Sequence, residues 1–168
     1  MKTLLFFISL LCLQGAYAKG VYQTPESFID DSFNGQTAQR ETVWLSKEHK
    51  QVIGNILQHP PRFLRVKYWR IGTKTVWILN EVGKEKLITV GILIDHTNIE
   101  RLKVLTFRES RGWEVKHDFF TRQFSGLALN EQQQLSQTVD GISGATLSVR
   151  ALKKMARIAL YLNQQRSQ

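Results

Sequence analysis

The chain has 168 residues, with 23 Lys and Arg against 14 Asp and Glu and a net charge of +9. A length of this order corresponds to one domain. The single cysteine is Cys12, so a chain that loses its first 18 residues cannot hold a disulfide, an iron–sulfur cluster or a thiolate zinc site.

Residues 1–18 have the pattern of a secretory signal peptide. Lys2 supplies the charged start, Thr3–Leu13 form the apolar run, and Ala16 and Ala18 place small side chains where a signal peptidase cleaves. We expect cleavage before Lys19 and an exported, periplasmic protein. Retention of the leader as an anchor is the alternative. After residue 18, no apolar run approaches the roughly 20 residues that span a bilayer.

Residues 19–45 are polar and rich in turn residues, which predicts an irregular N-terminal arm with at most a short helix around Glu26–Phe33. Ser46 then has the character of a helix N-cap. Apolar residues recur at helical spacing after it, and two prolines follow His59, so we expect a helix over Lys47–Gln58. This helix opens the functional domain, which we place at residues 46–168.

The next part of the chain has an apolar period of two and predicts an antiparallel meander. Turn residues separate the runs, and the third run is almost continuously apolar, as expected for a strand with both faces covered. The expected strands are Phe63–Ile71, Thr75–Asn80, Leu87–Ile94 and Leu102–Phe107.

After the strands, we expect a short helix around Asp118–Gln123, a polar glutamine-rich stretch over Asn130–Gln137, and a long amphipathic helix from Leu147 to about Gln164. Strands grouped together, with helices at both ends, favour an α+β fold: a single domain in which helices flank an antiparallel sheet.

The sequence Asp-Gly-Ile-Ser-Gly-Ala-Thr, residues 140–146, leads directly into the last helix. A helix N-terminus offers unpaired backbone N–H groups and a partial positive charge, so an anion is stabilised there. The alternative is structural: Ser143 or Thr146 caps the helix and the glycines form a turn.

The run from Asp140 to Thr146 closely resembles the flavinylation motif of the FMN-binding domain family. That family includes the exported FMN-carrying subunits of the sodium-translocating quinone reductase and of the Rnf electron-transport complex. The resemblance implies an FMN-binding-domain-like fold and an FMN joined through its phosphate to Thr146 by a flavin transferase outside the cytoplasm. It also implies that Ser143, Gly144 and Ala145 belong to the site. Asp140 orients the metal or substrate of the transferase, or is only a turn residue.

The resemblance extends over roughly residues 86–162. The stretch Glu109-Ser110-Arg111-Gly112-Trp113 corresponds to a family Glu-Thr-Pro-Gly and an apolar residue against the flavin ring, and Phe124-Ser125-Gly126 to an aromatic-x-Gly. Glu109 either hydrogen-bonds the flavin loop or makes a solvated ion pair. Trp113 stacks on the flavin or fills the core.

Arg111 departs from the family pattern, because it stands where relatives carry proline. A positive charge facing the flavin would favour the anionic reduced form and raise the redox potential. Ser110 keeps the hydroxyl of the usual threonine.

The remaining charged and titratable residues give little further indication of chemistry. His49, His59, His96 and His117 follow no metal-ligand spacing, so we predict no metal site. The basic residues form no dense run, which argues against nucleic acid. The positive charge attracts acidic redox partners or an anionic membrane surface, or merely keeps the protein soluble.

We therefore hypothesise an exported flavoprotein that carries FMN on Thr146 and relays electrons. It would be a carrier or accessory subunit rather than a stand-alone enzyme. Its redox partner would be a cytochrome, another flavoprotein or a membrane quinone-linked complex. The alternatives are a module that binds flavin or another anion without a covalent bond or an electron partner, and an interaction protein in which the motif is a remnant.

Overall fold

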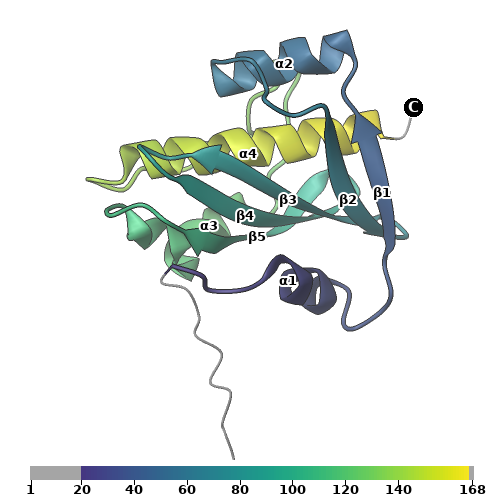
Figure 1. The fold of residues 1–168 in the computed structure, drawn as a ribbon, viewed down its shortest axis with the longest axis horizontal. Coiled ribbons are helices and arrows are strands. Elements are labelled where there is room, and N and C mark those ends of the chain that lie inside the picture. Colours follow the sequence, from purple (N-terminus) through teal and green to yellow (C-terminus); the bar gives the residue numbers. More distant parts are fainter. Residues whose placement is uncertain (1–19, 167–168) are drawn as a thin grey trace, which may run out of the picture.

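The computed structural model describes residues 20–166, so the predicted signal peptide lies outside the described residues. It confirms the α+β fold with an antiparallel sheet flanked by helices (Figure 1). Each strand of the five-stranded sheet pairs with the next one along the chain. The strands are β1 (Gln39–Trp44), β2 (Arg65–Ile71), β3 (Lys74–Val82), β4 (Leu87–Asp95) and β5 (Asn98–Phe107).

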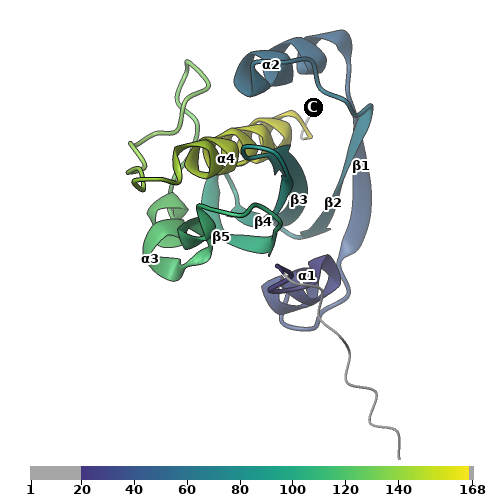
Figure 2. The same cartoon turned by 60° about the vertical axis from the view of Figure 1, so that its left-hand side comes forward.

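The helices cover both faces of the sheet. α2 and α4 lie on one face and α1 lies on the other (Figures 1 and 2). Short helical turns follow β5 and lead into the long loop before α4. The helices are α1 (Pro25–Ser32), α2 (Lys47–Leu57), α3 (Asp118–Thr121) and α4 (Thr146–Gln165), with 3-10 turns η1 (Trp113–Lys116) and η2 (Arg122–Phe124). No helix among residues 20–166 is long and apolar enough to cross a membrane.

Alternation along the strands produces two apolar cores. On β3, Val76 packs toward α1, while the next residue, Trp77, packs toward α4. Both side chains are fully buried. β4 is buried on both faces along nearly its whole length, as its apolar sequence predicts.

A glycine in the middle of β4 admits the ring of Phe28 from α1. A Cβ atom on Gly91 would lie 2.5 Å from Phe28 Cδ1, far inside van der Waals contact. The guanidinium carbon of Arg101 lies over the same ring, 5.1 Å from its centroid. The small residue therefore allows α1 to dock closely on the sheet.

The C-terminal half of α4 is tied to the sheet by buried polar groups. The Thr75 hydroxyl donates to Asn163 Oδ1 at 2.7 Å, and the Trp77 indole N–H donates to Thr75 Oγ1 at 3.0 Å. Asn163 Nδ2 donates to the carbonyl of His96 at 2.8 Å. Because each buried polar group has a partner, this contact fixes the position of α4 along the sheet.

The expectation of an irregular arm over residues 19–45 is wrong for one stretch, the strand β1. α1 confirms the short helix expected around Glu26–Phe33. β1 was not expected, because only Val43 and Trp44 of its six residues are apolar. Its formation depends on pairing with β2, from Gln39↔Arg70 to Trp44↔Arg65, which is a long-range contact. The four expected strands and the helix after Ser46 are confirmed.

Candidate functional site

The first turn of α4 has no side-chain cap. Ala145 is the N-cap residue, and no side chain among residues 20–166 accepts a hydrogen bond from the helix start. The alternative in which Ser143 or Thr146 caps the helix is therefore wrong. Thr146 is the first helical residue and is exposed at the surface.

Three backbone donors are consequently free at this helix start. The first intrahelical bond runs from the N–H of Val149 to the carbonyl of Ala145 at 2.9 Å. Within the described residues, the N–H groups of Thr146, Leu147 and Ser148 have no hydrogen-bond partner. The helix dipole adds about half a positive charge at the same end. An anion placed beside Thr146 would satisfy these donors.

The approach to these donors is open. Gly144 has φ +80°, a left-handed conformation that favours glycine, and nothing lies within 4 Å of an ideal Cβ position on it. Within the described residues, the backbone of Gly144 is therefore uncovered where a side chain would stand.

A cleft of about 500 Å³ lies at this helix start. One wall is the beginning of α4, and the other is the loop that follows β5. The two walls touch, because a Cβ on Gly112 would lie 3.3 Å from both Cα and Cβ of Ala145. The structure thus brings together the two segments that the sequence singled out. The cleft is lined by Lys84, Glu109, Ser110, Arg111 and residues 144–148.

The charges at the cleft favour an anion. Lys84 and Arg111 are both exposed in its lining. Glu109 is the one carboxylate among the lining residues, and its Oε1 points at the β3–β4 turn. The cations and the helix dipole therefore act in the same direction.

Glu109 has a structural partner that neither predicted role included. Its Oε1 accepts hydrogen bonds from the backbone N–H groups of Lys84, Glu85 and Lys86 at 2.5, 2.8 and 3.0 Å. Burial of the Glu109 carboxyl raises its pKa, but these donors outweigh burial and hold the pKa below its usual value. Glu109 is therefore an ionised clasp that holds the β3–β4 turn against the end of β5.

Trp113 is not a core residue. Its side chain is 47% exposed, which excludes the core-filling alternative. The ring is 5.3 Å from the His117 ring, and the Lys116 ammonium is 5.1 Å from its centroid. Trp113 is outside the cleft lining, and its stacking on a flavin stays a prediction.

Asp140 and Ser143 also lie outside the cleft lining and are exposed. The backbone N–H of Asp140 donates to Gln123 Oε1 at 2.7 Å, which anchors the loop before α4. Phe124 is buried in the main core. Within residues 20–166, no three His, Cys, Asp or Glu side chains come together in a way that could hold a metal.

Sequence reasoning missed three residues of the cleft: Lys84, Leu147 and Ser148. Lys84 belongs to the β3–β4 turn, whose backbone donates hydrogen bonds to Glu109 beside the cleft. No local sequence signal could have placed it there. Ser148 is buried against Gly112, and its position follows from the first turn of α4.

Residues 83–161 match the family described as FMN-binding domain. This range runs from the β3–β4 turn into α4 and contains every residue that lines the cleft. No curated protein matches the chain.

Proposed function

We propose that this chain, whose residues 83–161 belong to the FMN-binding domain family, carries FMN covalently on Thr146 and relays electrons outside the cytoplasm. Binding of a flavin follows from the family. The observation that carries the covalent proposal is the exposed hydroxyl-bearing residue at an uncapped helix start, in a cleft with two cations.

The residues present fit the phosphate of FMN. The free N–H groups of Thr146, Leu147 and Ser148 supply donors, and Lys84 and Arg111 supply positive charge. The open space over Gly144 lets the phosphate oxygens approach the backbone. Anion binding and attachment to Thr146 would therefore take place at the same helix start.

A phosphoester at Thr146 needs an accessible hydroxyl oxygen. Thr146 Oγ1 would attack the FMN phosphorus of a flavin dinucleotide and form the phosphoester bond. The phosphoanhydride bond would break, the nucleoside monophosphate would leave, and the hydroxyl proton would pass to a base of the flavin transferase. Because no side-chain capping bond engages the helix start, this oxygen is free to react. A covalent bond is useful outside the cytoplasm, where a dissociated cofactor would be diluted. The signal-peptide pattern of residues 1–18 supports this location.

An electron relay fits the cleft better than a complete enzyme does. The flavin supplies the redox chemistry when bound, while the chain holds it and sets its potential. The cleft lies at the surface, and the exposed Trp113 lies next to its wall. The one carboxylate in the lining is already used by the β3–β4 turn. The positive charge of the chain favours an acidic cytochrome, flavoprotein or quinone-linked complex as partner.

Binding without a covalent bond is the second candidate, because the same donors would hold the phosphate of a free flavin. The two candidates differ in one measurement. The full chain is coexpressed with a flavin transferase, purified, and examined by intact mass and by flavin fluorescence on a denaturing gel. We expect one added FMN less water, with fluorescence retained after denaturation.

Variants locate the bond. Thr146→Val should abolish the added mass, Thr146→Ser should keep part of it, and Thr138→Val should leave it unchanged, since Thr138 is another exposed threonine outside the cleft. Flavin that separates from the polypeptide on denaturation would support the non-covalent module. A colourless protein purified from cells with active transferase would remove both candidates.

A further inference from the structure

The sheet is split between β2 and β3. Their register runs only from Tyr68↔Trp77 to Ile71↔Lys74. β2 begins earlier, at Arg65, and β3 continues to Val82. Residues 65–67 therefore pair with β1 alone, and residues 78–82 pair with β4 alone. Neighbouring strands are normally joined by hydrogen bonds along their length, so the divergence opens a gap in the sheet.

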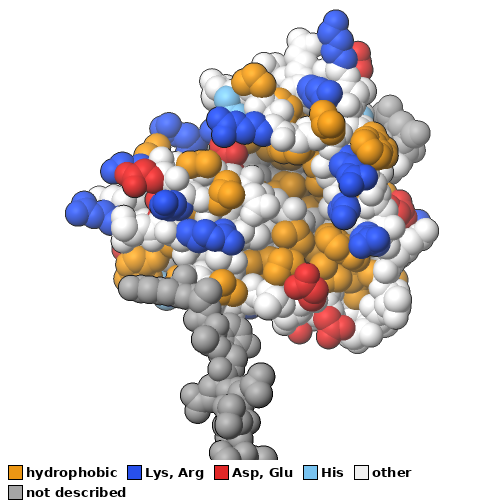
Figure 3. Space-filling view, viewed as in Figure 1, with side chains coloured by type: hydrophobic (Ala, Val, Ile, Leu, Met, Phe, Trp, Pro, Cys, Tyr) orange, Lys and Arg blue, Asp and Glu red, His pale blue; other side chains and the backbone are white. Residues whose placement is uncertain are grey.

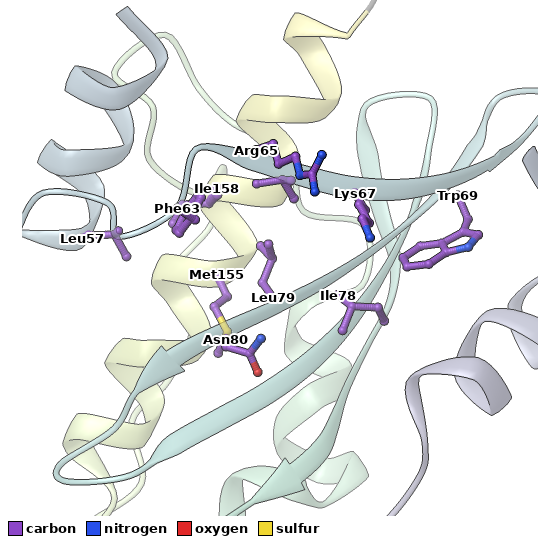
Figure 4. Close-up of a pocket in the computed structure, with 11 residues that line it drawn as sticks. Leu57, Phe63, Arg65, Lys67, Trp69, Ile78, Leu79, Asn80, Met155 and Ile158 are labelled. Carbon is purple, nitrogen blue, oxygen red and sulfur yellow. The ribbon is translucent and has the colours of Figure 1, made fainter. Parts of the chain in front are cut away.

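A cavity of about 510 Å³ occupies this gap. Its floor is formed by Leu57 of α2 and by Met155 and Ile158 of α4, which are almost completely buried. Figure 4 shows Met155 and Ile158 from α4 together with side chains of β2 and β3 around the cavity. The cavity thus passes through the sheet onto the helix layer, and it has the size of a small-molecule site, about 300 to 1,000 Å³.

The mouth of the cavity is cationic. Arg65 and Lys67 line it and are exposed, and both belong to β2 (Figure 4). On this side of the molecule, hydrophobic side chains are flanked by Lys and Arg side chains (Figure 3). Arg65 also lies over Trp44, at 5.1 Å from the ring centroid, and that ring is 64% exposed. The cavity therefore has an apolar floor, and positively charged side chains and an exposed indole lie at its mouth.

We propose that this cavity binds a single-chain anionic amphiphile, with its acyl chain on the floor and its carboxylate or phosphate head at Arg65 and Lys67. Apolar area removed from water drives the chain into the cavity. The two cations select the sign of the head group. Trp69, part of the lining, packs beside the chain.

A peptide strand fits the cavity less well. It would lie in the plane of the sheet and pair with the free edges of β2 and β3. The floor at Met155 and Ile158 lies on the helix side of that plane, so the backbone of an added strand would leave the depth of the cavity to short side chains. A flexible acyl chain can follow the depth of the cavity.

This site is separate from the flavin cleft, because the two cavities share no lining residue. Met155 lies nine positions after Thr146 on α4, which is about 13 Å along the helix axis. The inference therefore does not depend on the flavin and can be tested on the protein with or without it.

The test is titration calorimetry of the full chain with laurate below its micelle concentration. Lysophosphatidylglycerol with the same chain tests a lipid head group against a free carboxylate. Either anion binding at one site supports the proposal and identifies the source. Dodecanol and dodecyltrimethylammonium should bind at least about tenfold more weakly.

Charge variants test the rim. Arg65→Glu with Lys67→Glu should weaken laurate binding roughly tenfold or more. Lys103→Glu with Arg122→Glu makes the same change in net charge at two exposed residues outside the cavity and should stay within about twofold of the parent. Equal losses in the two double variants would overturn the proposal.

Fluorescence quenching locates the chain independently of charge. Laurate brominated at its chain end should quench tryptophan emission, and Trp69→Phe should remove most of that quenching. Trp113→Phe, beside the other cleft, should not. Equal binding of all head groups, no binding of either anion, or binding only of an extended acidic peptide would overturn the proposal.

Discussion

Gly112 lies so close to Ser148 that a Cβ atom on Gly112 would stand 2.9 Å from Ser148 Oγ. This contact joins the loop after β5 to the first turn of α4. The two halves of the cleft are far apart in the chain, and this packing is what brings them together. The cleft therefore exists only when β5 and α4 are both in place.

Replacing Gly112 should separate these halves. Gly112 has φ +79°, so Gly112→Ala adds backbone strain of about 1 to 2 kcal/mol as well as the clash with Ser148. We expect lower thermal stability and reduced flavin loading. Gly126→Ala is the matched control, because Gly126 also has φ +79° but nothing lies within 4 Å of its Cβ position. Equal losses in both variants would show that the contact with Ser148 is unimportant.

The Glu109 clasp should make stability depend on pH. Its pKa lies below the ordinary value of 4.5, so its contribution is present above that value and is lost as pH falls through the lowered pKa. Glu109→Gln keeps an acceptor oxygen but no charge. We expect it to lower the free energy of unfolding by about 1 to 2 kcal/mol at neutral pH.

As the pH falls from neutral through the lowered pKa of Glu109, the same variant should lose less stability than the parent, because it has no carboxylate to protonate. Chemical denaturation at several pH values measures this difference. Glu131→Gln, at an exposed position, serves as control. If the free energy of unfolding had the same pH dependence in the parent and in Glu109→Gln, this stabilising role of the Glu109 carboxylate would be contradicted.

Arg111 should raise the redox potential of the bound flavin. It lines the cleft and is exposed, so solvent screens its charge. Arg111→Gln and Arg111→Pro should each lower the two-electron midpoint by about 5 to 20 mV. Potentiometric titration of the flavinylated protein measures the change, with Arg122→Gln as control. An unchanged midpoint in both Arg111 variants would show that its charge does not act on the flavin.

The contact between Phe28 and Gly91 should be sensitive to one methyl group. Gly91→Ala places a Cβ 2.5 Å from the Phe28 ring and should cost about 1 to 3 kcal/mol of stability. Phe28→Leu by itself should also lower the free energy of unfolding. The double variant should lose less free energy of unfolding than the sum of the two single losses. Urea denaturation of the parent, the two single variants and the double variant measures the free energies of unfolding. Strictly additive losses would contradict a direct clash between the two side chains.

The elements that could be predicted from the sequence are those whose signals lie within the element itself or next to it in the chain. Ser46 caps α2 and forms a capping box with His49, and the apolar period before the two prolines set its length. The third predicted strand is recognisable because both of its faces are buried. β1 escaped prediction because its residues are mostly exposed and its partner strand lies more than 20 residues away.

The same distinction applies to the site. The Ser-Gly-Ala-Thr run placed Thr146 at the start of a helix, and the structure confirms that position. The role of Glu109 could not be predicted, because it depends on a turn at residues 84–86 that reaches the end of β5 only in the folded sheet. The exposure of Trp113 likewise follows from packing and not from its neighbours in sequence.

The two ends of the described chain leave the domain at very different distances from the cleft. Val21 bridges Thr106 at the end of β5, only a few residues before the loop that forms one cleft wall. Arg166 follows the last turn of α4, a 20-residue helix about 30 Å long that begins at Thr146. A purification tag or an electrode linker attached behind Arg166 therefore leaves the cleft open to a docking protein, whereas the same attachment ahead of Gly20 would crowd it.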